Sequence, residues 1–222
     1  MIVVSSLTVA FGRTIALDGI DVEVPAGITG LFGPNGSGKS TLLRVIAGLQ
    51  RPTSGTVEID GLPVSSRDEL LRGRIGYSGH APGLYPHLTM SENLELFARL
   101  YGAPTARVEA SLEAVGLTAR AATYAGDLSA GLKRRASVAR ALVHDPDLLL
   151  LDEPYANVDD DAAEMISAAV REWCTAGKVS LIATHGAKKV KAFAGGGIIL
   201  RDGRVVVAGR YGAPRRPAAR QP

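Results

Sequence analysis

The chain has 222 residues, of which 46% are hydrophobic and 21% are charged, the profile of a soluble globular protein with one large domain. Its formal net charge of +3 is too small to indicate a nucleic-acid or membrane-surface partner by itself. A single cysteine, Cys174, excludes an internal disulfide. No run approaches the ~18 consecutive apolar residues of a membrane helix. The N-terminal residues lack the basic region of a signal peptide, so we expect a cytoplasmic chain.

The first third of the chain has the pattern of a strand-rich region around one helix. Alternating apolar residues predict two strands joined by a turn in which the aromatic Phe11 is exposed. A short apolar run, a glycine-rich turn and a helix ending at Gly48 follow. The predicted strands are residues 2–9, 15–24, 28–32, 56–59 and 74–77, and the predicted helix is 41–48.

From residue 79 the pattern changes from strands to helices. Thr89 and Glu92 have the spacing of a capping box, in which each side chain binds a backbone N–H of the other residue. The predicted helices are residues 90–101, 104–115 and 130–142. We therefore expect residues 79–144 to form a helical insert.

Strand character returns after residue 145. Residues 148–151 are four leucines, which is typical of a central parallel strand covered on both faces. The remaining predicted elements are helix 160–175, strand 179–184, helix 187–193 and a hairpin of strands 198–200 and 204–207. We expect one α/β domain over residues 1–222, with its core and β subdomain formed by 1–78 and 145–212, and a disordered tail at 213–222.

The glycine-rich turn fits the P-loop pattern G-x-x-x-x-G-K-[ST] at every fixed position, between a predicted strand and a predicted helix. Backbone N–H groups of such a turn and the positive end of the helix form a cradle for phosphate oxygens. Lys39 adds a charge near the β- and γ-phosphates, and the Ser40 hydroxyl can bind Mg²⁺. The P-loop residues are Gly33, Pro34, Asn35, Gly36, Ser37, Gly38, Lys39, Ser40 and Thr41.

Two acidic residues follow the leucine strand, where they can reach a nucleotide held by the P-loop. Asp152 can reach Mg²⁺ through water, and Glu153 can polarise the attacking water as a general base. A second possible phosphate site lies at the start of the predicted helix 130–142, where Ser129 and the Gly131 backbone are placed. Arg134 and Arg135 in its first turns oppose the helix dipole, which indicates that helix stability alone does not explain them.

The order of these motifs resembles the ATP-binding subunits of ABC transporters, and the resemblance runs from Val4 to about Gly209. Order and spacing together are more specific than any one motif. The residues that carry the resemblance after the P-loop are Leu128, Ser129, Ala130 and Gly131 as signature, Asp152 and Glu153 as Walker B, Asn157, Val158 and Asp159 as D-loop, and His185 as switch histidine.

The resemblance implies a P-loop NTPase (RecA-like) core with an antiparallel β subdomain and an inserted α-helical subdomain. It implies a head-to-tail homodimer with ATP between the P-loop of one subunit and the signature of the other. Mg²⁺ would be bound by Ser40 and Asp152, Glu153 and His185 would be catalytic, and Phe11 would stack on the adenine. The implied partners are integral membrane permease subunits at the cytoplasmic face of the membrane, with no nucleic acid and no direct insertion.

Three of the four histidines lie outside the implied catalytic pair. His80 stands where most relatives have glutamine, in the loop that links core and insert. Mg²⁺ prefers oxygen ligands, so we expect His80 to act on the metal through water or not at all. We expect His80 to matter more for coupling transport to ATP hydrolysis than for the hydrolysis itself. His87 and His144 are expected at the surface.

The run Gly-His-Ala-Pro-Gly-Leu-Tyr at residues 79–85 resembles the ATP-binding subunit of the haem exporter of cytochrome c maturation. Haem export is therefore the leading interpretation. An alternative is the energy subunit of another exporter, for drugs, lipids or polysaccharide. A soluble ABC ATPase acting on DNA or ribosomes is disfavoured because such chains usually carry two cassettes or a long coiled-coil insertion. A small-molecule kinase would leave the signature unexplained.

Overall fold

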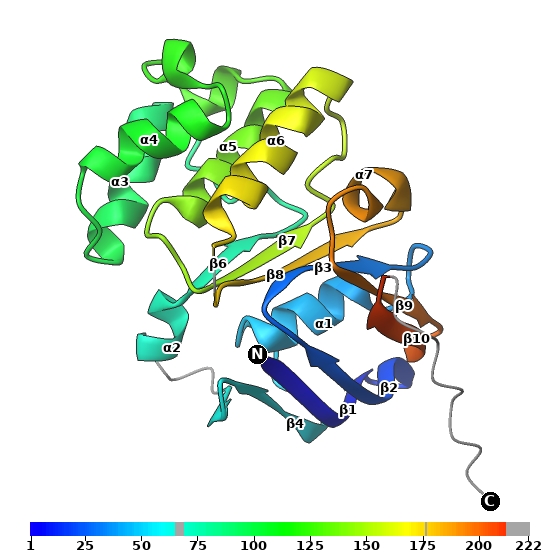
Figure 1. The fold of residues 1–222 in the computed structure, drawn as a ribbon. Helices are drawn as coiled ribbons and strands as arrows, with labels where there is room; N and C mark the ends of the chain where they lie inside the picture. The colour runs from blue at the N-terminus through cyan, green and yellow to red at the C-terminus, as the bar shows by residue number, and fades with distance from the viewer. Residues whose placement is uncertain (65–68, 176, 212–222) are drawn as a thin grey trace, which may run out of the picture.

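The computed structural model describes residues 1–64, 69–175 and 177–211, and its centre is a six-stranded sheet (Figure 1). In sequence order its strands are β3 (Gly27–Phe32), β6 (Ile75–Ser78), β7 (Leu148–Asp152), β8 (Val179–Thr184), β9 (Gly196–Arg201) and β10 (Arg204–Arg210). They are arranged in space as β10-β9-β3-β8-β7-β6, and all pairs are parallel except β9 with β10. The carboxyl ends of the parallel strands therefore share one edge, where open α/β sheets bind ligands.

A second, antiparallel sheet packs on the other side of the helix that follows the P-loop (Figure 1). Its strands are β1 (Ile2–Phe11), β2 (Thr14–Val24), β4 (Ser54–Ile59) and β5 (Leu62–Pro63), in the order β2-β1-β4-β5. Alternate residues of β1, including Ile2 and Val4, are buried and join one apolar cluster with helix α1 (Lys39–Ile46). The helix is thus held between the two sheets.

The leucines of β7 divide the apolar core into two clusters. The first and third belong to the cluster that contains α1, and the second and fourth belong to a cluster with α5 (Ala130–Leu142) and α6 (Asp160–Trp173). Because successive side chains of a strand point to opposite faces, α1 and α5 cover opposite faces of the same sheet, as Figure 1 shows. The predicted central parallel strand, covered on both faces, is confirmed.

The remaining larger helices, α3 (Met90–Leu100) and α4 (Ala106–Ala114), pack with α5 in the second cluster. The predicted capping box is present: the Glu92 N–H donates to Thr89 Oγ1 at 3.2 Å, and the Thr89 N–H donates to Glu92 Oε2 at 2.8 Å. Two N–H groups that a helix start leaves without partners are satisfied in this way. No helix in the described residues is long and apolar enough to cross a membrane.

Every strand and larger helix predicted from the sequence is present, with ends that differ by a few residues, and the α/β class is confirmed. Phe11 closes strand β1 instead of lying in the turn. The sequence did not predict β5 or α2 (Glu69–Gly73), because elements this short show no hydrophobic period. The tail predicted at 213–222 lies outside the described residues.

The expectation that His144 lies at the surface is wrong. Its ring is partly buried and stacks on Tyr101, with 4.1 Å between the ring centroids. Burial lowers the pKa of the His144 imidazole from 6.5 to about 4, because the charged form loses its hydration there. The helix α5 ends two residues earlier, and this places the ring against the end of α3.

We expect a His144→Phe variant to lose less stability on acidification than the wild type. Below about pH 6.5 the unfolded chain binds a proton at His144 that the folded chain does not bind until about pH 4, so wild-type stability falls as the pH falls through this window. Phenylalanine keeps the stack and removes the titration. Urea unfolding at pH 7, 5.5 and 4.5 measures the difference; identical pH profiles for the two proteins would contradict the assignment.

Candidate nucleotide site

The P-loop joins the carboxyl end of the central strand β3 to α1. Gly38 precedes the helix with φ 100°, a conformation that suits glycine, and a Cβ there would lie 2.6 Å from the carbonyl oxygen of Ala16. The loop is therefore pressed against β2, and it leads directly into the positive end of α1. This arrangement can hold an anion.

Lys39 lies inside this loop with a buried ammonium group. Its exposed fraction is 6%, and Nζ donates to the carbonyl oxygens of Gly33 at 2.8 Å and Pro34 at 2.9 Å. Among the described residues no carboxylate pairs with it. Ser37 Oγ, also buried, has no hydrogen-bond partner within residues 1–64, 69–175 and 177–211. A buried cation balanced only by carbonyl dipoles favours binding of an anionic ligand.

Asp152 ends strand β7 with a carboxylate that is 1% exposed and has no hydrogen-bond partner in the described part of the chain. The nearby Arg134 guanidinium attracts this carboxylate electrostatically, but a buried carboxylate whose oxygens lack donors is costly, so a metal ion beside them would be favourable. No group of three or more potential metal-ligating His, Cys, Asp or Glu side chains occurs in the described residues. A single buried carboxylate near a phosphate cradle fits Mg²⁺, which commonly uses one or two carboxylates, substrate phosphates and water.

Glu153, the next residue, points toward the end of β8. Its carboxylate accepts hydrogen bonds from the Thr184 hydroxyl at 3.0 Å and the His185 N–H at 2.9 Å, and it lies 3.0 Å from His185 Nδ1. Glu153 has φ 50°, which is uncommon for a residue other than glycine and is held by the bond from its N–H to the Ala183 carbonyl at 2.8 Å. The structure thus brings together the two predicted catalytic side chains.

Thr184 was not among the residues predicted for the site. Its hydroxyl both donates to Glu153 and accepts from the Gly186 N–H at 3.0 Å, so it links the acid to the turn after β8. The available signal was a hydroxyl at the last residue of a buried strand, directly before the histidine.

The predicted signature begins α5. Ser129 is the N-cap, and its Oγ accepts a hydrogen bond from the Leu132 N–H at 3.3 Å. A Cβ at Gly131 would lie 2.9 Å from the carbonyl oxygen of Asn157, so the signature abuts the predicted D-loop of the same chain. Asp159 of that loop caps α6 by accepting from the Ala162 N–H at 2.7 Å. Capping gives Ser129 and Asp159 a local role in addition to any contact with a ligand.

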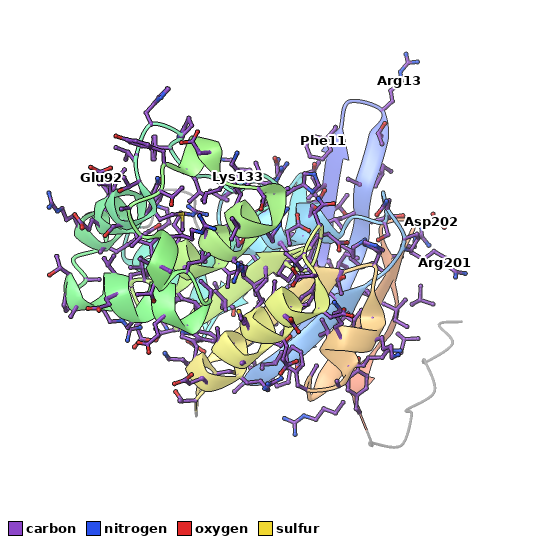
Figure 2. The ribbon with its side chains drawn as sticks, turned by 90° about the horizontal axis from the view of Figure 1, so that it is seen from above. Phe11, Arg13, Glu92, Lys133, Arg201 and Asp202 are labelled. Carbon is purple, nitrogen blue, oxygen red and sulfur yellow. The ribbon has the colours of Figure 1, made fainter. Side chains whose placement is uncertain are left out.

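The structure does not bring the signature to the P-loop of its own chain. The signature starts a helix on one face of the central sheet, and the P-loop starts the helix on the opposite face (Figure 1). Phe11 is 51% exposed and lies beside the turn that joins β1 to β2 (Figure 2). Ala16, in the same strand pair, lies against the P-loop at Gly38. His80 is exposed, in the loop that follows β6.

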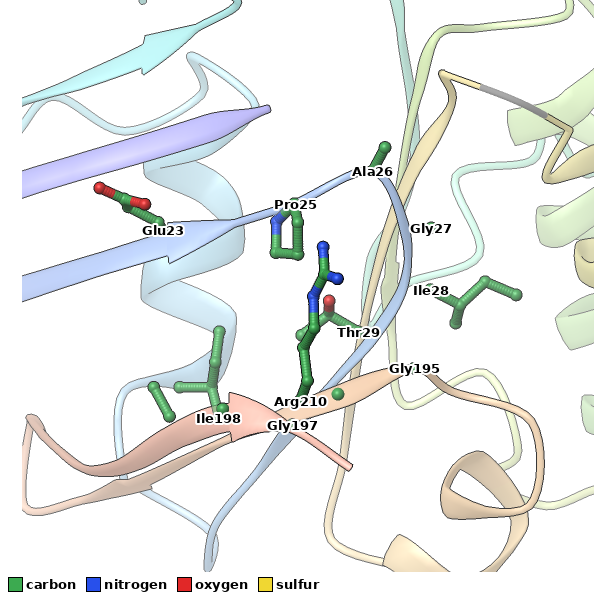
Figure 3. Close-up of a pocket in the computed structure, with 13 residues that line it drawn as sticks. Glu23, Pro25, Ala26, Gly27, Ile28, Thr29, Gly195, Gly197, Ile198 and Arg210 are labelled. Carbon is green, nitrogen blue, oxygen red and sulfur yellow. The ribbon is translucent and has the colours of Figure 1, made fainter. Parts of the chain in front are cut away.

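One hollow lies away from these residues. It has a volume of about 350 Å³ and is lined by the start of β3, Gly195–Gly197, Glu23 and Arg210 (Figure 3). The P-loop follows the carboxyl end of β3, whereas this hollow opens at the amino end. It is therefore separate from the phosphate cradle.

A P-loop after a central parallel strand, with acidic residues at the end of a strand in the same sheet, defines a nucleotide-binding cassette. A family model described as ABC transporter matches residues 17–156. One solved structure, described as the ATP-binding subunit of an ABC transporter, has a TM-score of 0.87 and 28% identity, with 95% of this chain and 90% of that chain covered. Another, a dimeric ATP-binding cassette in a post-hydrolysis state bound to ADP and Pi, has a TM-score of 0.86, 28% identity and coverages of 95% and 98%.

Curated relatives include Nod factor export ATP-binding protein I of Cupriavidus metallidurans, 37% identical over 205 residues, covering 90% of this chain and 68% of the relative. The protein of the same name from Burkholderia lata is 38% identical over 204 residues, with coverages of 90% and 67%. The chain therefore belongs to the ABC transporter family. It has the ATP-binding cassette fold and is an ABC-type ATPase.

We expect Lys39→Ala to abolish useful ATP binding. The variant removes the one full positive charge of the P-loop, and a charge-assisted bond to phosphate contributes about 1.5–3 kcal/mol, or about 10- to 100-fold in affinity. Titration with a fluorescent ATP analogue measures it. Lys189→Ala is the matched control, because Lys189 pairs with Asp160 on the surface. Wild-type affinity in the P-loop variant would exclude the cradle.

Proposed function

We propose that the chain is the ATP-hydrolysing subunit of an ABC exporter and that two copies bind two ATP molecules head to tail. The observation that carries the proposal is the placement of the two phosphate-binding helix starts on opposite faces of one sheet. The signature cannot complete the nucleotide site of its own chain, but a second copy turned around a two-fold axis can supply it. The related cassette solved as a dimer supports this assembly.

The contacts at the ends of β7 and β8 support the role of each acid. Glu153 is the general base, and His185 with Thr184 orients its carboxylate toward the attacking water. Asp152 and Ser40 are the residues that would hold Mg²⁺, since both offer oxygen atoms. When bound, Mg²⁺ neutralises charge that develops on the phosphates. Phe11 stacks on the adenine ring.

The membrane partner binds beside the helical insert in this proposal. A groove of about 200 Å³ there is lined by side chains of the core and of the insert. Leu49 on one side is 59% exposed and Tyr101 on the other is 41% exposed, which leaves apolar surface for a partner. The subunit then lies at the cytoplasmic face of the membrane, and His80, next to the strand that lines the groove, transmits the nucleotide state.

The cargo follows from the relatives more than from the run at residues 79–85. Both relatives described above are named for Nod factor export, and neither is named for haem. This favours the alternative, an exporter of another cargo, over haem export. A test is to express the chain in cells that lack their own haem exporter subunit. We expect no recovery of cytochrome c; recovery would restore the haem interpretation.

We expect Glu153→Gln to keep ATP binding, to lose turnover and to accumulate an ATP-bound dimer. Glutamine has the same shape but cannot accept the proton. Phosphate release measures turnover, and size-exclusion chromatography with light scattering measures the dimer. Glu164→Gln, at an exposed acid on α6, is the control and should behave as wild type. Turnover at the wild-type rate in Glu153→Gln, or a monomer at saturating ATP, would contradict the proposal.

A further inference from the structure

Helix α5 is bound along its length to the strand β6 and to the loop that follows it. The Arg134 guanidinium donates to the carbonyl oxygens of Gly79 and His80, both at 2.8 Å. One turn later the Ser137 hydroxyl lies 2.7 Å from the Ser78 hydroxyl. The helix and the strand therefore meet through a row of side chains at three-residue spacing, since positions three apart share a helix face.

The row continues to the end of the helix. Arg140 Nη2 donates to the Tyr77 carbonyl at 2.8 Å. A Cβ at Gly76 would lie 2.2 Å from the carbonyl oxygen of Ala141, so the two backbones are in close contact. Residues 134, 137 and 140 thus bind residues of β6 and its loop in reverse order, and a sliding motion of one element along the other would break all of these bonds.

Arg134 is the member of the row nearest the nucleotide residues. It is 6% exposed, and its Nη1 also lies 3.5 Å from the backbone carbonyl of Asp152. One buried side chain of the signature helix thereby reaches both the His80 loop and the end of the Walker B strand. Removing the guanidinium would take away the donor of the Gly79 and His80 carbonyls and the weaker, 3.5 Å contact with the Asp152 carbonyl.

We infer that Arg134 is a positioning residue that makes the signature helix and the His80 loop move as one body. A displacement of the loop, which borders the proposed membrane-subunit groove, is then transmitted to Ser129–Gly131 and so to the ATP held by the opposite subunit. The effect on ATP of the opposite subunit rests on the proposed head-to-tail dimer. The link through Arg134 between the signature helix and the His80 loop, here called the tie, does not. It also accounts for an arginine placed against the helix dipole.

Amide hydrogen exchange of the nucleotide-free chain tests the tie without the dimer. In Arg134→Gln we expect exchange to accelerate by about tenfold, ~1.4 kcal/mol of local stability, both in the peptide around His80 and in the signature peptide. Arg135→Gln is the matched control, because Arg135 on the same turn donates to the Val115 and Gly116 carbonyls at the end of α4. It should leave the His80 peptide protected.

The transmission to the ATP site between subunits is tested in the Glu153→Gln background. The quantity measured is the ATP concentration at which half of the protein is dimeric. We expect Arg134→Gln to raise it by about tenfold while the affinity of the P-loop for ADP stays within about twofold of the wild type. Arg134→Lys should be intermediate, because an ammonium cannot span the same carbonyls. It also provides a folded variant if the glutamine substitution prevents folding.

Unchanged exchange at the His80 peptide in Arg134→Gln, or equal acceleration there in Arg135→Gln, would overturn the inference. A lysine variant identical to wild type in both readouts would also overturn it, because charge alone would then suffice. Failure of Glu153→Gln itself to dimerise with ATP would count against the proposed function and would leave the exchange result to decide on the tie.

Discussion

The two helices whose first turns we propose to bind phosphate, α1 and α5, pack on opposite faces of one sheet. Successive leucine side chains of β7 point to opposite faces of the sheet, and one helix covers each set. Moving either helix to the other face would expose the leucines that it covers. The P-loop therefore offers a nucleotide its own charge and dipoles, but not the hydrogen-bond donors of the signature in the same chain. In the proposed dimer a second copy of the chain provides them, and the packing of this core is the reason that a dimer is needed.

The adjacent acids Asp152 and Glu153 show how backbone conformation separates two roles. Asp152 is the last residue of the strand, and its buried carboxylate receives no hydrogen bond from the part of the chain that the structure describes. Glu153 turns out of the strand in a left-handed conformation, and three bonds hold its carboxylate at Thr184 and His185. The oxygens of the first acid accept no hydrogen bond from the described residues and can receive a metal ion, whereas the second acid is already oriented. Two acids one residue apart are thus held in different surroundings, which supports the different roles proposed for them.

The sequence was sufficient to predict the fold class. It was also sufficient to predict the elements with a clear hydrophobic pattern, such as the leucine strand and the helix capped by Thr89. Local motifs also predicted the P-loop and the pair Glu153 and His185, because each follows a strand that ends at one edge of the sheet. It was insufficient for Thr184 and for the burial of His144, since both depend on neighbours distant in sequence. The sequence places the basic Arg134 near a helix start, but only the structure reveals the carbonyls it binds.

The most direct measurement of the central claim is the ATPase activity of mixed subunits, each of which is inactive alone. In a head-to-tail dimer, Lys39→Ala and Ser129→Arg damage the same composite site and leave the other intact. In a 1:1 mixture about half of the dimers contain one subunit of each kind, and each of these dimers has one intact site. The mixture should therefore recover up to about a quarter of wild-type activity. Lys39→Ala mixed with a chain carrying both substitutions has no intact site and should stay inactive. Activity of Ser129→Arg alone at the wild-type rate, or no recovery in a mixture shown to contain heterodimers, would contradict the account.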